Sequence, residues 1–304
     1  MEIVHRASAG FYIAMLHRRC TIRSPITVRD VIEKLILKRN PQWQKINDVR
    51  SVRWNDTFSS EISSAHEPIR IIGLPETVLG RFGGWNMSQI AREHTDSRKQ
   101  VEVRRSSSSK AYTMYGSAPT SPTEDVYKDF RSMVSFAEFA DWFESGPTSG
   151  TDGLYLANTP LRHIVPDGIG LELPPDVKRK LLPQTPLVYF GKGLQRTPLH
   201  FDPTGNVVLV VRGQKTFKLF PPVSSLDLQP LGGILEAILS WYGGWLPAVY
   251  SQLTGHEDFL GSVPHINVEL KAGEGLWMPS CWWHAVTGSA DPNGIIVYGL
   301  RNED

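Results

Sequence analysis

The chain has 304 residues, of which 40% are hydrophobic, and its 32 basic and 31 acidic residues leave a formal net charge of +1. This length and composition allow one domain with a substantial core, and the balanced charge gives no overall electrostatic footprint for nucleic acid. The two cysteines, Cys20 and Cys281, are too few for a zinc module and favour a reducing compartment, so an intracellular protein is expected.

Residues 1–47 are expected to form a helical extension that packs on the domain that follows. Residues 7–16 form an apolar run that is too short to span a bilayer and lacks a clear cleavage site, so no membrane association is expected. Residues 27–39 predict a helix, because Thr27 and Asp30 form a capping box ahead of an apolar stripe.

A polar stretch and a second helix come next. Residues 95–126 contain serine and proline clusters, which are typical of a surface loop. Ser135 and Glu138 form a second capping box and predict a helix through Phe143 with an inward aromatic face. A glycine-containing loop then leads into an apolar strand that contains Tyr155.

A histidine and an aspartate two residues apart, His200 and Asp202, end the segment T-P-L-H-F-D that begins at Thr197. Because side chains alternate along a strand, residues with this spacing point to the same face. Residues 206–211 and 216–222 predict two strands joined by a tight hairpin through Arg-Gly, with the His-x-Asp motif at its mouth.

Residues 223–264 form a long connection after these strands. It includes an aromatic group made of Tyr242, Trp245 and Tyr250. These aromatics are expected mainly to pack against the wall of the domain, with a role in covering a binding site as the alternative. His256 and His265 lie in or near this segment but lack a strand-end context, so neither is assigned to a metal.

A second candidate ligand, His284, closes the run G-E-G-L-W-M-P-S-C-W-W-H and lies 82 residues after Asp202 (284 − 202). Residues 276–278 predict a short buried strand that a proline ends, so this histidine also follows a strand end. Two histidines and a carboxylate on three neighbouring corners of an octahedron suit Fe(II) and leave three positions open. The sequence therefore predicts a non-haem iron site made of His200, Asp202 and His284.

These motifs resemble those of JmjC-type Fe(II)/2-oxoglutarate oxygenases, in the small hydroxylase-like branch. The resemblance rests on T-P-x-H-x-D, on an asparagine six residues and a lysine fifteen residues after the first histidine, and on G-x-G-x-x-x-P-x-x-W-W-H. The strand at 154–156 resembles one in the asparaginyl hydroxylase that acts on hypoxia-inducible factor. The resemblance covers about residues 48–304, the expected catalytic domain, and implies a mainly β fold with flanking helices: a double-stranded β-helix, that is, a cupin-like jelly roll.

The resemblance also implies a role for each site residue. The triad of two histidines and one aspartate would hold Fe(II), with 2-oxoglutarate as cosubstrate and dioxygen as oxidant. Lys215 would bind the distal carboxylate of 2-oxoglutarate, with the hydroxyl of Thr197 and the phenol of Tyr155 donating to the same group. Asn206 would lie nearer the metal, against the other end of the cosubstrate or the ligands.

The expected activity is hydroxylation of a protein or peptide side chain, because no zinc cluster or chromatin-reading motif accompanies the domain. Lysine N-methyl demethylation and hydroxylation of an RNA nucleoside or small molecule are alternatives, as is a catalytically silent binding module. The chain ends shortly after residues 295–298 with no further helix pair, which predicts a monomer or weak dimer.

Overall fold

The computed structural model describes residues 48–301 apart from 55–57, 64, 94–95, 97, 107–130, 147–152, 167–172, 184–185, 194, 232, 234–247 and 254–256. The expected extension at 1–47, with its helix at 27–39, lies outside the described residues, as do most of 95–126 and the insertion aromatics Tyr242 and Trp245. Among the described residues, no helix is long and apolar enough to cross a membrane.

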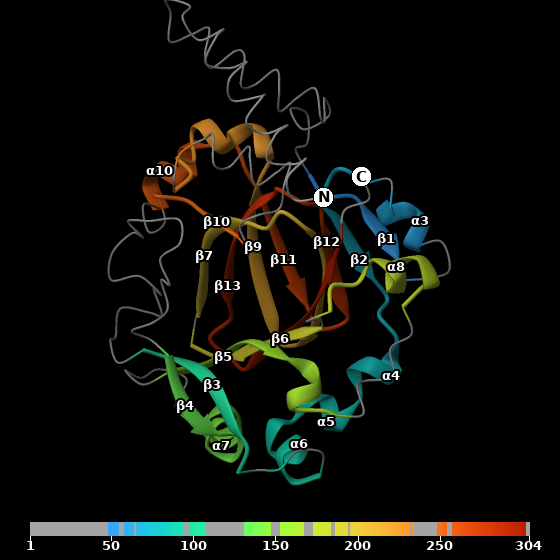
Figure 1. Ribbon diagram of the computed structural model, residues 1–304, viewed down its shortest axis with the longest axis vertical. Helices are drawn as coiled ribbons and strands as arrows, with labels where there is room; N and C mark the ends of the chain where they lie inside the picture. The colour runs from blue at the N-terminus through green and yellow to red at the C-terminus, as the bar shows by residue number, and fades with distance from the viewer. Residues whose placement is uncertain are drawn as a thin grey trace, which may run out of the picture.

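Two facing β-sheets form the body of the protein (Figure 1). The larger sheet has nine strands in the order β1 (Ser51–Arg53), β2 (Ile69–Ile72), β12 (Glu274–Met278), β8 (Gly205–Arg212), β14 (Asn293–Leu300), β6 (Leu187–Gly191), β5 (Gly153–Pro160), β3 (Gln100–Ser106) and β4 (Arg131–Ser135). The smaller sheet has five in the order β10 (Val249–Tyr250), β7 (Arg196–Phe201), β13 (Trp283–Gly288), β9 (Gln214–Phe220) and β11 (Ile266–Lys271).

The chain passes repeatedly between the two sheets. Strands β6, β8, β12 and β14 belong to the larger sheet, and β7, β9, β11 and β13 belong to the smaller one. This alternation defines a double-stranded β-helix, a form of jelly roll. The expected fold, mainly β with flanking helices, is confirmed.

Short helices flank this barrel. The described helices are α3 (Phe58–Ser63), α4 (Glu76–Leu79), α5 (Phe82–Trp85), α6 (Met87–Glu93), α7 (Phe136–Ser145), α8 (Pro175–Lys180) and α10 (Glu257–Ser262), with 3-10 turns at Leu161–His163 and Pro222–Leu226. Figure 1 shows α5, α6 and α7 gathered at the bottom of the view, with α7 beside β3 and β4, at the opposite end from α10. The predicted second helix is confirmed as α7, and the Ser135 hydroxyl accepts a hydrogen bond from the backbone N–H of Glu138 (3.1 Å).

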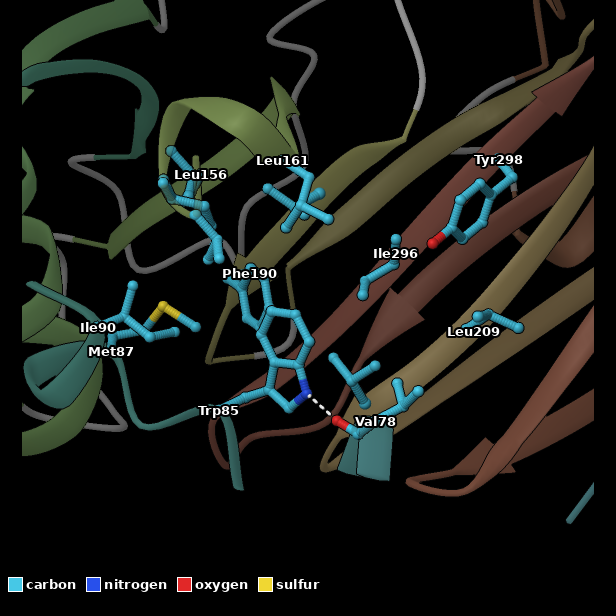
Figure 2. Packing of buried hydrophobic residues seen from close by; sticks show 14 of the residues in the cluster. Val78, Trp85, Met87, Ile90, Leu156, Leu161, Phe190, Leu209, Ile296 and Tyr298 are labelled. Atoms are coloured by element: carbon cyan, nitrogen blue, oxygen red, sulfur yellow. Dashed lines mark hydrogen bonds between the residues drawn. The ribbon is translucent and has the colours of Figure 1, made fainter. Parts of the chain in front are cut away.

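The central strands of the larger sheet, such as β8 and β14, are buried on both faces. Along β8, Val207 and Leu209 pack in the cluster under the helices, whereas Val208 packs in the cluster on the barrel side. Trp85 anchors the helical layer, because its indole N–H donates to the carbonyl of Val78 (2.9 Å) and its ring stacks on Phe190 at 5.8 Å (Figure 2). The helical layer around Trp85 therefore covers the outer face of the larger sheet, and the inner face of this sheet lines the barrel interior.

An ion pair ties the end of β8 to the helical layer. The guanidinium of Arg212 contacts both carboxylate oxygens of Glu144 on α7, at 2.6 and 2.7 Å, and also donates to the backbone carbonyl of Trp85 (2.8 Å). The same carboxylate accepts from the backbone N–H of Met87 (2.6 Å). This two-point contact holds β8 in a defined position.

The tight hairpin predicted between residues 206–211 and 216–222 is wrong. The two strands are consecutive, but β8 pairs with β12 and β14, and β9 pairs with β11 and β13. Gly213 turns the chain from one sheet to the other with φ +62°, and a Cβ there would clash with the backbone of Pro292 and Asn293. Because β8 is apolar on both faces, it is most stable between two strands in the middle of the larger sheet.

Candidate metal centre

His200 and His284 stand directly opposite each other on neighbouring antiparallel strands, β7 and β13. Opposed residues in an antiparallel pair project from the same face, and the centroids of the two imidazoles are 4.1 Å apart. Asp202 lies one residue beyond the end of β7, where its backbone carbonyl accepts from the N–H of Cys281 (2.8 Å). The structure thus brings together the three residues that the sequence singled out.

Backbone carbonyls set the orientation of both imidazoles. Nδ1 of His200 lies 2.7 Å from the carbonyl of Pro198, and Nδ1 of His284 lies 3.0 Å from the carbonyl of Trp282. A carbonyl only accepts, so each Nδ1 carries a proton, and in the neutral imidazole this leaves the lone pair on Nε2. Both Nε2 atoms lie 3.9 Å from a carboxylate oxygen of Asp202.

The donor set fits a divalent metal ion. One ligand atom from each of His200, Asp202 and His284 lies within 4.8 Å of the others, and this is the one such group of three found in the described part of the chain. Two imidazole nitrogens and one carboxylate oxygen on one side of a centre leave the opposite side open. The backbone partners of Nδ1 are the kind of support that metal-bound histidines have.

Burial shapes the protonation of Asp202 and His284. Burial raises the pKa of Asp202, against the opposing effects of His200 and of a hydrogen bond from Asn206. Burial, followed by the proximity of His200, holds the pKa of His284 well below its ordinary value, against the hydrogen bond to Trp282. The neutral imidazole that metal binding requires is therefore favoured, and a cation at the centre would offset the cost of burying the carboxylate.

Asn206 reaches the triad from the opposite sheet. It lies on β8, is 8% exposed, and its side-chain Nδ2 donates to Oδ2 of Asp202 (2.7 Å). This contact fixes the carboxylate in one orientation. The structure therefore places Asn206 beside the candidate metal ligands, one of the two positions that the resemblance implied.

We expect Asn206→Leu to lower metal affinity about 10- to 100-fold, because loss of a group that orients a ligand has effects of that size. Calorimetric titration with Mn(II) or Co(II) measures it. Asn267→Leu, at an exposed position of β11, is the matched control and should bind like the wild type. Equal affinity in both variants would show that Asp202 needs no support from β8.

Lys215 is a buried cation on the same face of the smaller sheet. It is 1% exposed and pairs across strands with Gly288, while Leu219 on the same strand pairs with His284. Lys215 and Leu219 are four residues apart along β9, so the backbone of Lys215 lies about 13 Å along the strand from the pair that contains His284. Burial lowers the pKa of Lys215 to about 7, and no ion pair joins it to a carboxylate among the described residues.

Tyr155 lies against this lysine. It is 2% exposed on β5, and the Lys215 Nζ is 5.2 Å from the centroid of its ring. Tyr155 also belongs to a small cluster against which Tyr189 and Tyr250 pack. The expected partners of a distal carboxylate, a buried ammonium and a phenol, are therefore neighbours in the structure.

Thr197 faces the barrel because of a bulge. His284 pairs with His200, but Val286 pairs with Thr197, so three residues of β7 match two of β13. In a regular strand, residues three apart point to opposite faces; the extra residue brings Thr197 to the face of His200. Thr197 and His200 therefore face the same side of β7.

Gln195 is a buried residue near Lys215 that no spacing rule singled out. It is 1% exposed, and a Cβ on Gly288, the strand partner of Lys215, would clash with its amide. Asn293 donates from Nδ2 to two carbonyls in residues 289–291 (3.0 and 2.9 Å), so its Oδ1 accepts from Gln195 Nε2. Gln195 Oε1 is left without a hydrogen-bond partner among the described residues. A buried oxygen without a hydrogen bond destabilises the folded state by about 1 to 3 kcal/mol. Gln195 is therefore a candidate contact for a bound small molecule.

Comparison with known proteins adds one finding. A family model described as a cupin-like domain matches residues 55–298, most of the chain. No curated protein matches the chain significantly.

Proposed function

The chain belongs to the cupin-like domain family, and we propose that it is an Fe(II)- and 2-oxoglutarate-dependent dioxygenase that hydroxylates a protein or peptide side chain. The observation that carries the proposal is a pair of features on one face of the smaller sheet. His200, Asp202 and His284 form a site suited to a divalent metal, and a buried ammonium, Lys215, lies further along that face.

The residues of this chain would bind and orient the reactants. When bound, Fe(II), 2-oxoglutarate and dioxygen supply the oxidation, in which 2-oxoglutarate yields succinate and CO2 and one oxygen atom enters a substrate C–H bond. His200, Asp202 and His284 would hold the metal from one side, and Lys215 would neutralise a carboxylate of 2-oxoglutarate further along the same face, with Thr197 and Tyr155 as donors. The apolar barrel excludes water from the reacting groups.

A protein or peptide substrate is the class that the chain's properties favour. A net charge of +1 gives no general attraction to nucleic acid. Capture with the inactive variant Asp202→Ala, followed by mass spectrometry of wild-type products, distinguishes the classes. A gain of one oxygen atom on a captured peptide supports the proposal, whereas loss of a methyl group with formaldehyde release would indicate demethylation.

Succinate formation tests the activity without knowledge of the substrate. Wild-type protein loaded with Fe(II) should convert 2-oxoglutarate slowly to succinate in air, and omission of either Fe(II) or 2-oxoglutarate should stop this. The variant Asp202→Ala should be inactive. If metal and 2-oxoglutarate bind but no succinate forms with any captured partner, the chain is a binding module instead.

A further inference from the structure

Tyr250 lies directly beside one histidine of the metal centre. It is the second residue of β10 and stands opposite His200 in the antiparallel pair of β10 with β7. The ring centroids of Tyr250 and His200 are 5.5 Å apart, and their planes meet at 25°, a stacked arrangement. On the other side, β13 brings His284 to 4.1 Å. The His200 imidazole is therefore flanked by a ring on each neighbouring strand.

Backbone and side-chain contacts hold Tyr250 in this place. The fully buried Ser251 donates from its hydroxyl to the carbonyl of Leu228 (2.5 Å) and from its backbone N–H to the carbonyl of Leu199 (3.0 Å). The backbone N–H of Leu231 donates to the carbonyl of Tyr250 (2.7 Å). A strand of only two residues is thus anchored at several points, which makes the position of its tyrosine well defined.

The stacked ring of Tyr250 adds a restraint on the orientation of the His200 imidazole. The hydrogen bond between Nδ1 and the carbonyl of Pro198 fixes one corner of the imidazole, and a pivot about that corner is the motion that would swing Nε2 away from Asp202. A flat ring packed on its face opposes this pivot. Aromatic stacking has a preferred geometry, so it restrains orientation as well as position.

We propose that Tyr250 is a positioning residue of the metal centre, whose stacked ring keeps Nε2 of His200 directed at the ion. The proposal rests on the metal site proposed above, but not on 2-oxoglutarate or on any substrate. It gives the 223–264 connection a part in metal binding, beyond the packing role expected for its aromatics from the sequence.

Two substitutions at Tyr250 separate the ring from its hydroxyl. Tyr250→Leu removes the ring but keeps an apolar side chain, and Tyr250→Phe keeps the ring. We expect Tyr250→Leu to lower Co(II) affinity about tenfold or more and to alter the visible absorption of bound Co(II), whereas Tyr250→Phe should match the wild type in both. Val249→Ala is the matched control, because Val249 is the other residue of β10 and pairs with Phe201.

Each result has a definite reading. Unchanged Co(II) affinity and spectrum in Tyr250→Leu overturn the proposal. So does an equal loss in Tyr250→Phe, which would assign the effect to the hydroxyl, or in Val249→Ala, which would assign it to loosening of β10. Thermal melting checks that each variant folds, and Tyr250→Phe remains a test if Tyr250→Leu does not. Wild-type protein that fails to bind Co(II) would contradict the metal site itself, a distinct result.

Discussion

Replacing His200, Asp202 or His284 singly with alanine should abolish measurable metal binding and succinate formation while the barrel stays folded. Each residue supplies one of three ligand atoms in a compact group, and even a residue that only orients a ligand contributes about 10- to 100-fold to affinity. Burial already disfavours charge on Asp202 and His284, so alanine removes little native stability. We expect the melting temperature to change by no more than about 4 °C, roughly the effect of 1 kcal/mol in a domain of this size.

His265→Ala is a demanding control for these variants. Its Nδ1 also lies 2.7 Å from a carbonyl two residues earlier, that of Val263, and its ring contacts Phe220. His265 therefore shares the local geometry of the two triad histidines but has no place in the triad. Metal titration should give the wild-type affinity for His265→Ala. A comparable loss of affinity in this variant would show that metal binding does not depend specifically on His200, Asp202 and His284.

Lys215→Met should strongly weaken 2-oxoglutarate binding and at the same time stabilise the protein without ligand. Burial lowers the pKa of Lys215 from 10.5 to about 7. Each pKa unit of such a shift corresponds to ~1.4 kcal/mol of free energy. The charged lysine therefore costs the native state a few kcal/mol, which an apolar side chain of similar length does not. In the complex, however, methionine leaves a buried carboxylate unpaired, at a cost of about 2 to 5 kcal/mol in binding.

The pH dependence follows from the direction of this shift. Between about pH 7 and pH 10.5, the unfolded chain holds a proton on Lys215 that the folded protein has released, so this residue makes the protein more stable as pH rises. The stability advantage of Lys215→Met is therefore full below about pH 7 and disappears toward pH 10.5. Because only the ammonium pairs with a carboxylate, wild-type affinity for 2-oxoglutarate should fall as pH rises above about 7.

Denaturant unfolding at several pH values and calorimetric titration of 2-oxoglutarate measure these two effects. Lys218→Met is the control, since Lys218 lies on the same strand but is only partly buried. Lys218→Met should leave both the free energy of unfolding and the affinity for 2-oxoglutarate close to the wild-type values. A Lys215→Met protein that binds 2-oxoglutarate normally would place the carboxylate anchor elsewhere.

The sequence by itself identified the residues with chemical roles and the local elements around them. The His-x-Asp motif with a distal histidine points to a metal because these residue types and spacings have few other uses together. The helix α7 was predictable because its signals, the cap at Ser135 and the inward aromatic stripe, lie within ten residues. The jelly roll itself came from the family resemblance rather than from any local pattern.

Only the tertiary structure decided which strands pair and what surrounds the triad. A short turn at Gly213 predicts a hairpin, yet β8 and β9 enter different sheets, because strand partners depend on the burial of both faces across the whole barrel. The bulge that turns Thr197 inward depends on the match between β7 and β13. Tyr250 could not be distinguished from other aromatics of its segment, since its contact with His200 is created by sheet pairing between residues 50 positions apart (250 − 200). The residues of a motif can be recognised from a short stretch of sequence. The side chains that pack against them, such as Tyr250, depend on how the strands of the whole barrel pair.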